Sequence, residues 1–333
     1  MKKIAIVKLS ALGDIVHAMV ALQFIKKQFP DSQIDWLVES RFAEVLAHNP
    51  HIHRILTVNL KAVKKNKFAI FNEIQTVKSY AKNNYDIVID AQGLLKSAIT
   101  ARFLGHTIAG FDAKSIREPL ASFFYSLKIA SAYDANTIDR NAAVLSRSLG
   151  FSISHDAILN KEPFLFFESP RVDIRSFMRV ELKNIVFVIG STWPSRNYPA
   201  EKFVDVANGL AQNCLVIWGN ENERMAAENM ARQSNFIRVM PALDLNDVKA
   251  LLSQVDLVIG NDTGPTHFAW GLNTPSITLF GCTPVSRVYQ TAINKTLKSS
   301  SIVNPKKLNK QDYSISEIAP NCIIDLANEL LHL

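Results

Sequence analysis

The stretch Lys3-Ile-Ala-Ile-Val-Lys-Leu-Ser-Ala-Leu-Gly-Asp14 decides the fold class. Its first part, residues 3–7, is a short apolar run typical of a strand that is buried on both faces. A loop over residues 8–13 follows, and apolar residues then recur at helical spacing from Asp14 to Phe29, just before Pro30. Strand, loop and helix in this order predict a parallel sheet with helices on both of its faces.

The same order recurs along the whole chain. Further strands are expected at 34–38, 53–58, 85–90, 184–189, 214–218, 256–260 and 276–280. A length of 333 residues corresponds to about two domains. We therefore expect an α/β protein with two doubly wound domains that face a cleft, one over 1–160 and one over 161–313. A final helix within 314–333 is expected to pack back on the first domain.

Positive charge is concentrated in one half of the chain. Residues 1–150 hold 20 Lys and Arg against 12 Asp and Glu, a net charge of +8. Residues 151–333 hold 17 against 18, a net charge of −1. This asymmetry indicates a polyanionic partner for the first half.

The composition disfavours several classes of protein. No apolar run reaches the roughly 18 residues of a membrane-spanning helix, and Lys8 and Asp14 interrupt the apolar N-terminal stretch, unlike in a signal peptide. The widely spaced Cys214, Cys282 and Cys322 predict free thiols rather than disulfides or a zinc site. We expect a cytosolic protein.

The loop after the first strand lies where doubly wound folds bind their ligands. It contains Lys8, Ser10 and Gly13, and Asp14 stands at the start of the helix. Only one glycine of the three-glycine dinucleotide fingerprint is present, which disfavours a nicotinamide-dependent dehydrogenase. Asp14 is either an N-cap residue or, if its carboxylate points into the cleft, a general base.

A second candidate site is the segment Asn261-Asp-Thr-Gly-Pro-Thr-His267, which follows a strand and opens a helix. Its backbone N–H groups and the helix dipole suit a diphosphate. Thr263 and Thr266 add hydroxyl groups, and His267 could reach a phosphate. Asp262 would repel a phosphate unless it points elsewhere. A capped turn without a ligand is the simpler alternative.

Two more loops of the second half carry candidate residues. Gly190–Arg196 follows a strand and ends in a cation, which could neutralise a leaving diphosphate. Glu223 lies beyond the strand that ends at Trp218-Gly219, and its carboxylate could accept hydrogen bonds from ribose hydroxyls. A surface arginine and a solvated glutamate are the simpler alternatives when each is taken alone.

The first half also contains the basic segment Lys61-Ala-Val-Lys-Lys-Asn-Lys67, which Phe68 and Phe71 follow. Most charge runs form solvated faces. Aromatic residues beside a basic run suit an anionic amphiphile at a membrane surface. Nucleic acid would fit the charge equally well, but no recognition motif accompanies it. Arg117 is a further candidate anion contact.

Together, these loops resemble the bacterial lipopolysaccharide heptosyltransferases, which are inverting glycosyltransferases of the GT-B fold. The resemblance covers essentially the whole chain. The motifs that carry it are Val7–His17, Asp90–Ser97, Arg117–Ser122, Trp218-Gly219 with Glu223, and Asp262–His267. The second and third of these look most like the enzymes that add the first heptose to the Kdo region of lipid A.

The resemblance implies ADP-heptose as donor, Kdo-lipid A as acceptor and a peripheral position at the cytoplasmic face of the inner membrane. It implies no cofactor, no metal and no nucleic acid partner. Asp14 matches the family's general base. The donor-binding residues it implies are Lys8, Ser191, Thr192, Arg196, Trp218, Glu223, Asp262, Thr263, Gly264 and His267. The acceptor-binding residues are Ser10, Gly13, Lys61, Lys64, Lys65, Gln92 and Arg117. Arg196 stands where the family usually has a lysine.

Three other functions compete with this interpretation. A heptosyltransferase that adds a later heptose would share the donor site and differ in its acceptor. A nucleotide-sugar isomerase of the same fold would act without any acceptor. A two-domain solute-binding protein would not need the basic face of the first half.

Overall fold

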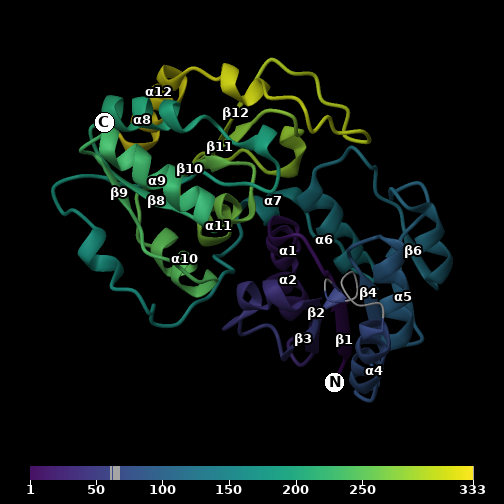
Figure 1. Ribbon diagram of the computed structural model, residues 1–333. Coiled ribbons are helices and arrows are strands. Elements are labelled where there is room, and N and C mark those ends of the chain that lie inside the picture. The colour runs from purple at the N-terminus through teal and green to yellow at the C-terminus, as the bar shows by residue number, and fades with distance from the viewer. Residues whose placement is uncertain (61, 63–67, 333) are drawn as a thin grey trace. The chain divides into compact units, whose positions relative to one another are not determined.

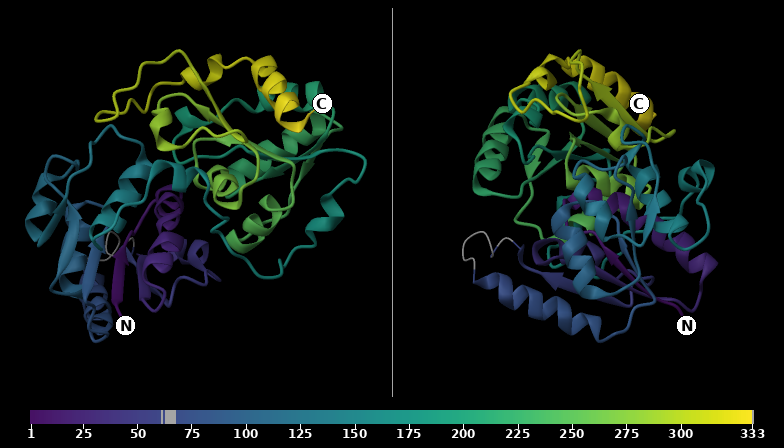
Figure 2. Two further views of the ribbon diagram at one scale, coloured as in Figure 1. Left: turned by 180° about the vertical axis from the view of Figure 1, so that it is seen from behind. Right: turned by 90° about the vertical axis from the view of Figure 1, so that its right-hand side faces the viewer.

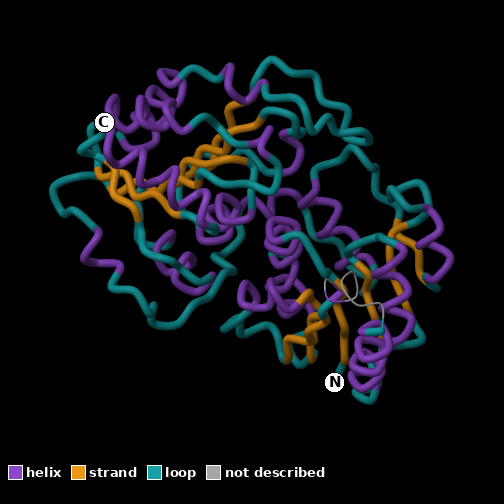
Figure 3. The backbone as a smooth tube through the Cα atoms, in the orientation of Figure 1, coloured by secondary structure: helices purple, strands orange, loops and turns teal. Residues whose placement is uncertain are grey.

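The computed structural model describes residues 1–60, 62 and 68–332. Its contacts divide the chain into two compact units, Met1–Phe166 and Phe167–Leu333. The sequence predicted a boundary slightly earlier, after residue 160. In each unit, strands form one sheet that helices surround (Figure 3).

The first unit is built on a parallel sheet of six strands in the order β3-β2-β1-β4-β5-β6 (Figure 1). Its strands are β1 (Lys3–Val7), β2 (Gln33–Glu39), β3 (Arg54–Val58), β4 (Ile87–Asp90), β5 (Ile108–Phe111) and β6 (Leu127–Ile129). The strands expected from the apolar runs are confirmed. The outer strands β5 and β6 were not expected.

Short helices connect these strands. They are α1 (Leu12–Met19), α2 (Ala21–Gln28), α4 (Ala69–Ala81), α5 (Leu95–Leu104), α6 (Thr137–Arg147) and α7 (His155–Leu159), with 3₁₀ turns η1 (Ser40–Leu46) and η2 (Pro119–Phe124). The helix expected from Asp14 to Phe29 is divided at Val20 into α1 and α2. Both pack against α6, whereas α4 and η2 pack against α5.

The second unit repeats the topology of the first. Its parallel sheet has the order β12-β11-β10-β7-β8-β9, so that β7 takes the place of β1 and β10 that of β4. The strands are β7 (Asn184–Val188), β8 (Asn213–Ile217), β9 (Ile237–Val239), β10 (Leu257–Asn261), β11 (Ser276–Phe280) and β12 (Asn294–Lys298). The helices are α8 (Ala200–Leu210), α9 (Glu221–Gln233), α10 (Leu245–Leu252), α11 (Gly264–Leu272) and α12 (Pro320–Leu331), with 3₁₀ turns η3 (Ile174–Phe177), η4 (Pro194–Arg196), η5 (Val285–Arg287) and η6 (Ser314–Glu317). Among the helices that the structure describes, none has the length and hydropathy needed to cross a bilayer.

Each sheet has a point at which the strand order reverses beside its first strand. This switch point lies between β1 and β4 in the first unit and between β7 and β10 in the second. Open α/β sheets bind ligands beyond the carboxyl ends of the strands at such points. The loops after these four strands carry most of the residues that the sequence singled out.

The final helix packs within the second unit, which corrects the expectation that it returns to the first. α12 lies against α8 (Figure 2). Ile323, Ala327 and Leu331 recur every four residues, which places them on one face of α12, and all three are buried in the second unit's core. Gly209 of α8 lets α12 approach α8 closely, because a Cβ at this position would lie 2.4 Å from Cδ1 of Ile324 in α12.

Replacing Ile323 with alanine is expected to lower the free energy of unfolding of the second unit by about 2–5 kcal/mol, because it leaves a cavity in a packed face. The neighbouring Cys322 is exposed, so Cys322→Ala is a matched control with an expected change within about 0.5 kcal/mol. Chemical denaturation of the full chain measures both. Equal stability of the two variants would contradict the packing of α12 on this core.

Candidate active site

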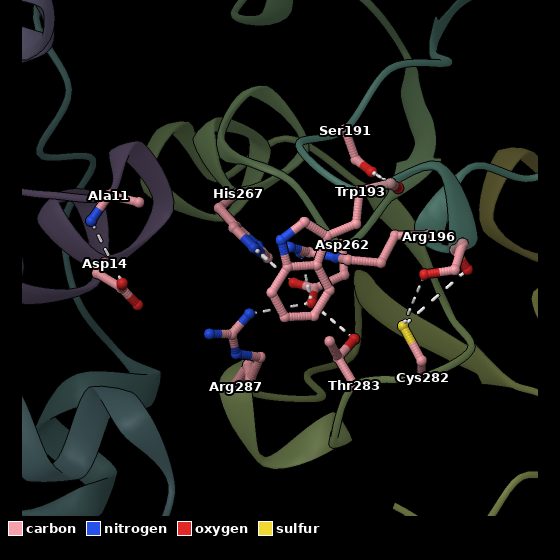
Figure 4. Close-up of polar contacts among 11 residues, drawn as sticks. Ala11, Asp14, Ser191, Trp193, Arg196, Asp262, His267, Cys282, Thr283 and Arg287 are labelled. Atoms are coloured by element: carbon pink, nitrogen blue, oxygen red, sulfur yellow. Dashed lines mark hydrogen bonds and ion pairs between the residues drawn. The ribbon is translucent and has the colours of Figure 1, made fainter. Parts of the chain in front are cut away.

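In the second unit, a group of polar and charged side chains surrounds the buried carboxylate of Asp262. The residue directly follows β10, and its backbone N–H donates to the carbonyl of Leu279 in β11 at 3.2 Å. The strand pairing therefore holds the residue in place. Only 1% of its side chain is exposed, and four other side chains contact its two oxygens (Figure 4).

The partners of Asp262 come from the ends of three neighbouring strands. Oδ2 forms an ion pair with Nη2 of Arg196 at 2.7 Å, and it accepts hydrogen bonds from Thr283 Oγ1 at 2.8 Å and Arg287 Nη1 at 3.3 Å. Oδ1 lies 3.1 Å from Nε2 of His267. Arg196 ends η4 after β7, His267 lies near the start of α11 after β10, and Thr283 and Arg287 follow β11. We call these five residues the Asp262 centre.

The cations of the Asp262 centre keep its carboxylate ionised. Burial alone would raise the pKa of Asp262. The charges of Arg287 and Arg196, with the hydrogen bond to His267, outweigh burial and hold this pKa well below its usual range. One carboxylate thus faces two guanidinium groups, and the excess charge is positive. Asp262 points at these cations, so its charge does not make the loop unfavourable for a phosphate.

Two buried polar atoms, one in η4 and one in α11, have no hydrogen-bond partner in the part of the chain that the structure describes. Nε of Arg196 and the hydroxyl oxygen of Thr266 are both buried and make no hydrogen bond within the described part of the chain. The side chain of Arg196 is only 11% exposed, and its guanidinium lies 5.5 Å from the ring centre of Trp193. Buried polar groups without partners are rare in folded proteins, so the unpaired Nε of Arg196 favours a bound ligand at the Asp262 centre over an empty capped turn.

The start of α11 adds backbone donors at the same edge of the sheet. Thr263 is the N-cap residue in an extended conformation, and its side chain makes no capping hydrogen bond. The helix begins at Gly264, which is buried. The first N–H groups of a helix lack partners within the helix, and its dipole favours an anion there.

Glu223 lies in the first turn of α9, beyond the end of β8. Its Oε2 accepts from the backbone N–H of Gly219 at 2.7 Å, and its Oε1 from Nδ2 of Asn220 at 2.6 Å. A Cβ at Gly190 would lie 2.1 Å from this carboxyl group, so the Glu223 carboxylate packs directly against Gly190. Gly190 follows β7, and the Glu223 carboxylate therefore lies beside the loop that leads to Arg196.

The other donor-side residues make contacts within their own loops. Oγ of Ser191 donates to the carbonyl of Trp193 at 2.8 Å, and Nε1 of Trp218 donates to the carbonyl of Met240 at 2.7 Å. Thr192 is exposed. Ser191 and Trp218 thereby shape the loops after β7 and β8.

In the first unit, Asp14 occupies the first turn of α1. Its Oδ2 accepts from the backbone N–H of Ala11 at 3.3 Å, so the carboxylate caps the helix (Figure 4). The side chain is partly exposed. Capping and a role as base are compatible, because a partly exposed carboxylate has further lone pairs for an incoming hydroxyl.

Lys8 lies at the end of β1 and is almost completely buried. Its Nζ donates to the carbonyl of Ala91 at 2.8 Å and to Oδ1 of Asn141 at 3.0 Å. Burial lowers the pKa of Lys8, and the charges of Asp14 and Asp90 oppose this shift. The ammonium expected to reach the donor is thus bound to groups of its own unit, and its charge favours the ionised form of Asp14.

A hydrogen-bond network centred on Asp90, which the sequence did not single out as a site residue, builds the turn after β4. Its Oδ1 accepts from the backbone N–H groups of Gln92 and Gly93, and its Oδ2 accepts from the hydroxyls of Ser97 and Tyr125 at 2.8 and 2.7 Å. Burial raises the pKa of Asp90, although these four hydrogen bonds oppose the shift.

This turn brings together two of the expected acceptor residues. Oε1 of Gln92 accepts from the backbone N–H of Ser10 at 3.1 Å, which joins the loops after β4 and β1. Gly13 lies in the first turn of α1 beside Asp14. Arg117 is 67% exposed and lies 3.8 Å from Glu118. Lys61, Lys64 and Lys65 lie outside the described residues.

Sequence reasoning missed Thr283 and Arg287 of the Asp262 centre. Both follow the confirmed strand at 276–280, one strand away from β10 in the sheet. Their position after a predicted strand could have identified them, because polar residues that follow adjacent parallel strands lie at the same edge of a sheet.

A family model described as glycosyltransferase family 9 (heptosyltransferase) matches residues 74–316, which include η2, Arg196 and the whole Asp262 centre. The chain belongs to this family. It is therefore a glycosyltransferase, and the expected GT-B fold is confirmed. Enzymes of this class transfer a sugar from an activated donor.

Curated relatives and solved structures match nearly the whole chain. Lipopolysaccharide heptosyltransferase 1 of Campylobacter coli is 35% identical, over 98% of this chain and 98% of the relative. The enzyme of the same name from Pseudomonas aeruginosa is 32% identical over 84% and 79%. The structure of E. coli heptosyltransferase WaaC with ADP-2-deoxy-2-fluoro heptose is 26% identical, covers 98% of this chain and 99% of that one, and has a TM-score of 0.79.

Replacing Asp262 with asparagine is expected to lower the free energy of unfolding at pH 7 by about 3–5 kcal/mol, because the two guanidiniums lose their counter-charge. The native pKa of Asp262 lies below its value in the unfolded chain. The carboxylate therefore stabilises the fold above the unfolded pKa, and this contribution is lost as the pH falls through the native pKa.

Denaturation of both proteins over a pH series measures this effect. The difference between wild type and Asp262→Asn should be largest near neutrality and should narrow in strong acid. A difference that stays constant down to strong acid would show that Asp262 does not act through its charge.

Proposed function

We propose that the chain transfers L-glycero-D-manno-heptose from ADP-heptose to the Kdo of Kdo-lipid A, with inversion, in the synthesis of the lipopolysaccharide inner core. The observation that carries this proposal is the Asp262 centre, a positively charged cluster at a switch point of a parallel sheet. The names of the relatives that match 84–98% of the chain supply the sugar and the pathway. The related structure with an ADP-heptose analogue supplies the nucleotide.

On the donor side, the diphosphate is expected to bind against Arg196 and the start of α11. ADP leaves with its negative charge on the diphosphate, and fixed cations and helix N–H groups stabilise such a charge best when they are already in position. Asp262 holds Arg196 in position through a 2.7 Å ion pair. The Glu223 carboxylate, beyond the end of β8, is suited to accept hydrogen bonds from the ribose hydroxyls.

Asp14 is proposed as the general base of a single displacement. A hydroxyl oxygen of Kdo attacks the anomeric carbon of the heptose, its proton passes to the Asp14 carboxylate, and the bond between the anomeric carbon and the diphosphate oxygen breaks. The attack comes from the face opposite the leaving group, which inverts the configuration. The charge of the buried Lys8 interacts with that of Asp14.

The surface of the first unit supports an amphiphilic, anionic acceptor. The elements α4 and η2 both pack against α5, and all three carry exposed large apolar side chains. These side chains are Leu95 and Ile99 on α5, Leu120 and Phe123 on η2, and Phe68 and Phe71 at the start of α4. Arg117 lies exposed beside η2. Apolar side chains with cations nearby are typical of surfaces that bind anionic lipids. We therefore propose that this face meets the lipid A moiety at the inner membrane, with Ser10, Gly13, Gln92 and Arg117 nearest to the sugar and phosphate groups.

Transfer is further proposed to need no metal ion, because two arginines and a helix N-terminus can supply the charge that a divalent cation supplies in other glycosyltransferases.

The decisive assay uses the purified chain with ADP-heptose and three acceptor conditions: Kdo-lipid A, a heptosylated acceptor, and none. The proposal expects ADP release and one added heptose with Kdo-lipid A only, both unaffected by EDTA. Transfer to the heptosylated acceptor alone would assign a later step of core synthesis. Turnover of ADP-heptose without an acceptor would indicate an isomerase or hydrolase. Loss of activity in EDTA would contradict the metal-free mechanism.

Replacing Asp14 with asparagine keeps the size of the side chain and removes the base. We expect kcat to fall by roughly 10²–10⁴-fold, the usual contribution of a general base. The exposed Asp31 of the same unit offers a matched control, and Asp31→Asn should keep the wild-type rate. An Asp14→Asn enzyme with wild-type turnover and an intact circular dichroism spectrum would remove Asp14 from this role.

A further inference from the structure

Arg287 is a cation that the sequence analysis did not select. It ends η5, in the loop after β11. Its Nη1 lies 3.3 Å from Oδ2 of Asp262, and 30% of its side chain is exposed. Arg196 approaches the same oxygen from the loop after β7, at 2.7 Å and with 11% of its side chain exposed. The two guanidiniums thus converge on one oxygen atom from different sides of the switch point.

Neutralising Asp262 does not require both arginines. Arg196 forms the shorter and more buried ion pair, and Thr283 and His267 complete the hydrogen bonds of the carboxylate. Arg287 adds a second positive charge to a centre whose single negative charge is already matched. Two guanidiniums held this close repel each other, so the arrangement becomes favourable when a further anion binds between them.

The position of Arg287 suits a diphosphate in particular. Thr263 and Gly264, which open α11, directly follow Asp262 in the chain, so the first helical N–H groups lie beside the centre. A guanidinium has five N–H donors in a rigid plane, and it can bind Asp262 with one edge and phosphate oxygens with another. Its partial exposure leaves it accessible to a ligand from solution.

We propose that Arg287 is a second diphosphate-binding residue of the donor site and that Asp262 is the positioning residue that orients both arginines. Arg196 then binds the diphosphate from the β7 side and Arg287 from the β11 side. The proposal rests on the proposed function in one respect, namely that the donor is an ADP-sugar.

The test compares the affinities of wild type and Arg287→Gln for ADP and for adenosine, by isothermal titration or by competition. Loss of a charge-assisted hydrogen bond to phosphate should weaken ADP binding by roughly 10- to 100-fold and leave adenosine binding unchanged. Arg287→Lys, which keeps the charge but not the planar fork, should recover part of the loss. Arg171→Gln is the matched control, because Arg171 is an exposed arginine of the same unit in an ion pair with Asp244.

The ratio of the two affinities separates contact with the ligand from a structural role. An equal loss for ADP and adenosine would show that Arg287 only supports the fold of the centre, and unchanged ADP binding would show that it plays no part; either result overturns the proposal. If the wild-type chain itself binds ADP no better than adenosine, the proposed donor is wrong and the proposal falls with it. A wild-type preference for ADP that Arg287→Gln keeps would leave the proposed function intact and refute only the role of Arg287.

Discussion

The ion pairs of the buried Asp262 carboxylate organise the second unit's site. The carboxylate directly follows β10, and it draws in one arginine from the loop after β7 and another from the loop after β11. These loops are far apart in sequence, and both arginines form ion pairs with this one carboxylate. Without the carboxylate, two arginines would not remain close together, because only a counter-charge offsets both their mutual repulsion and the cost of removing them from water. The excess of positive charge that results is what makes this edge of the sheet a site for an anionic leaving group.

The first unit also carries an aspartate near the end of the strand beside its switch point, and it uses this residue differently. Asp90 ends β4, which lies beside β1 as β10 lies beside β7. It is bonded by neutral donors, two backbone N–H groups and two hydroxyls, and burial raises its pKa. Asp262 is bonded by cations, and its pKa is lowered. One topology therefore supports two kinds of site: a turn held by neutral hydrogen-bond donors on the side proposed for the acceptor, and a charged centre on the side proposed for the diphosphate.

Much of this fold could be predicted from the sequence, because its central strands are continuous apolar runs bounded by polar loops. Four strands were missed: β5 has four residues, β6 and β9 have three residues each, and β12 (Asn294–Lys298) is largely polar. The packing of α12 was missed for a different reason. Its apolar face, with Ile323, Ala327 and Leu331, could cover either domain, and only the complementary surface of α8 decides between them.

The candidate site was predictable where a residue lies next to a strand end within a motif, as with Asp14 and the 262–267 loop. A residue such as Arg287 reaches the site only because its strand lies beside β10 in the sheet, so no local sequence motif identifies it. Lys8 shows the limit of placing a side chain by position alone, since its ammonium turns inward to the carbonyl of Ala91 and to Asn141. The most direct test of the account is a crystal structure of the chain with an ADP-heptose analogue. We predict that the diphosphate binds within hydrogen-bond distance of Arg196 and the first turn of α11, with the anomeric carbon facing Asp14. A diphosphate bound away from the Asp262 centre would contradict it.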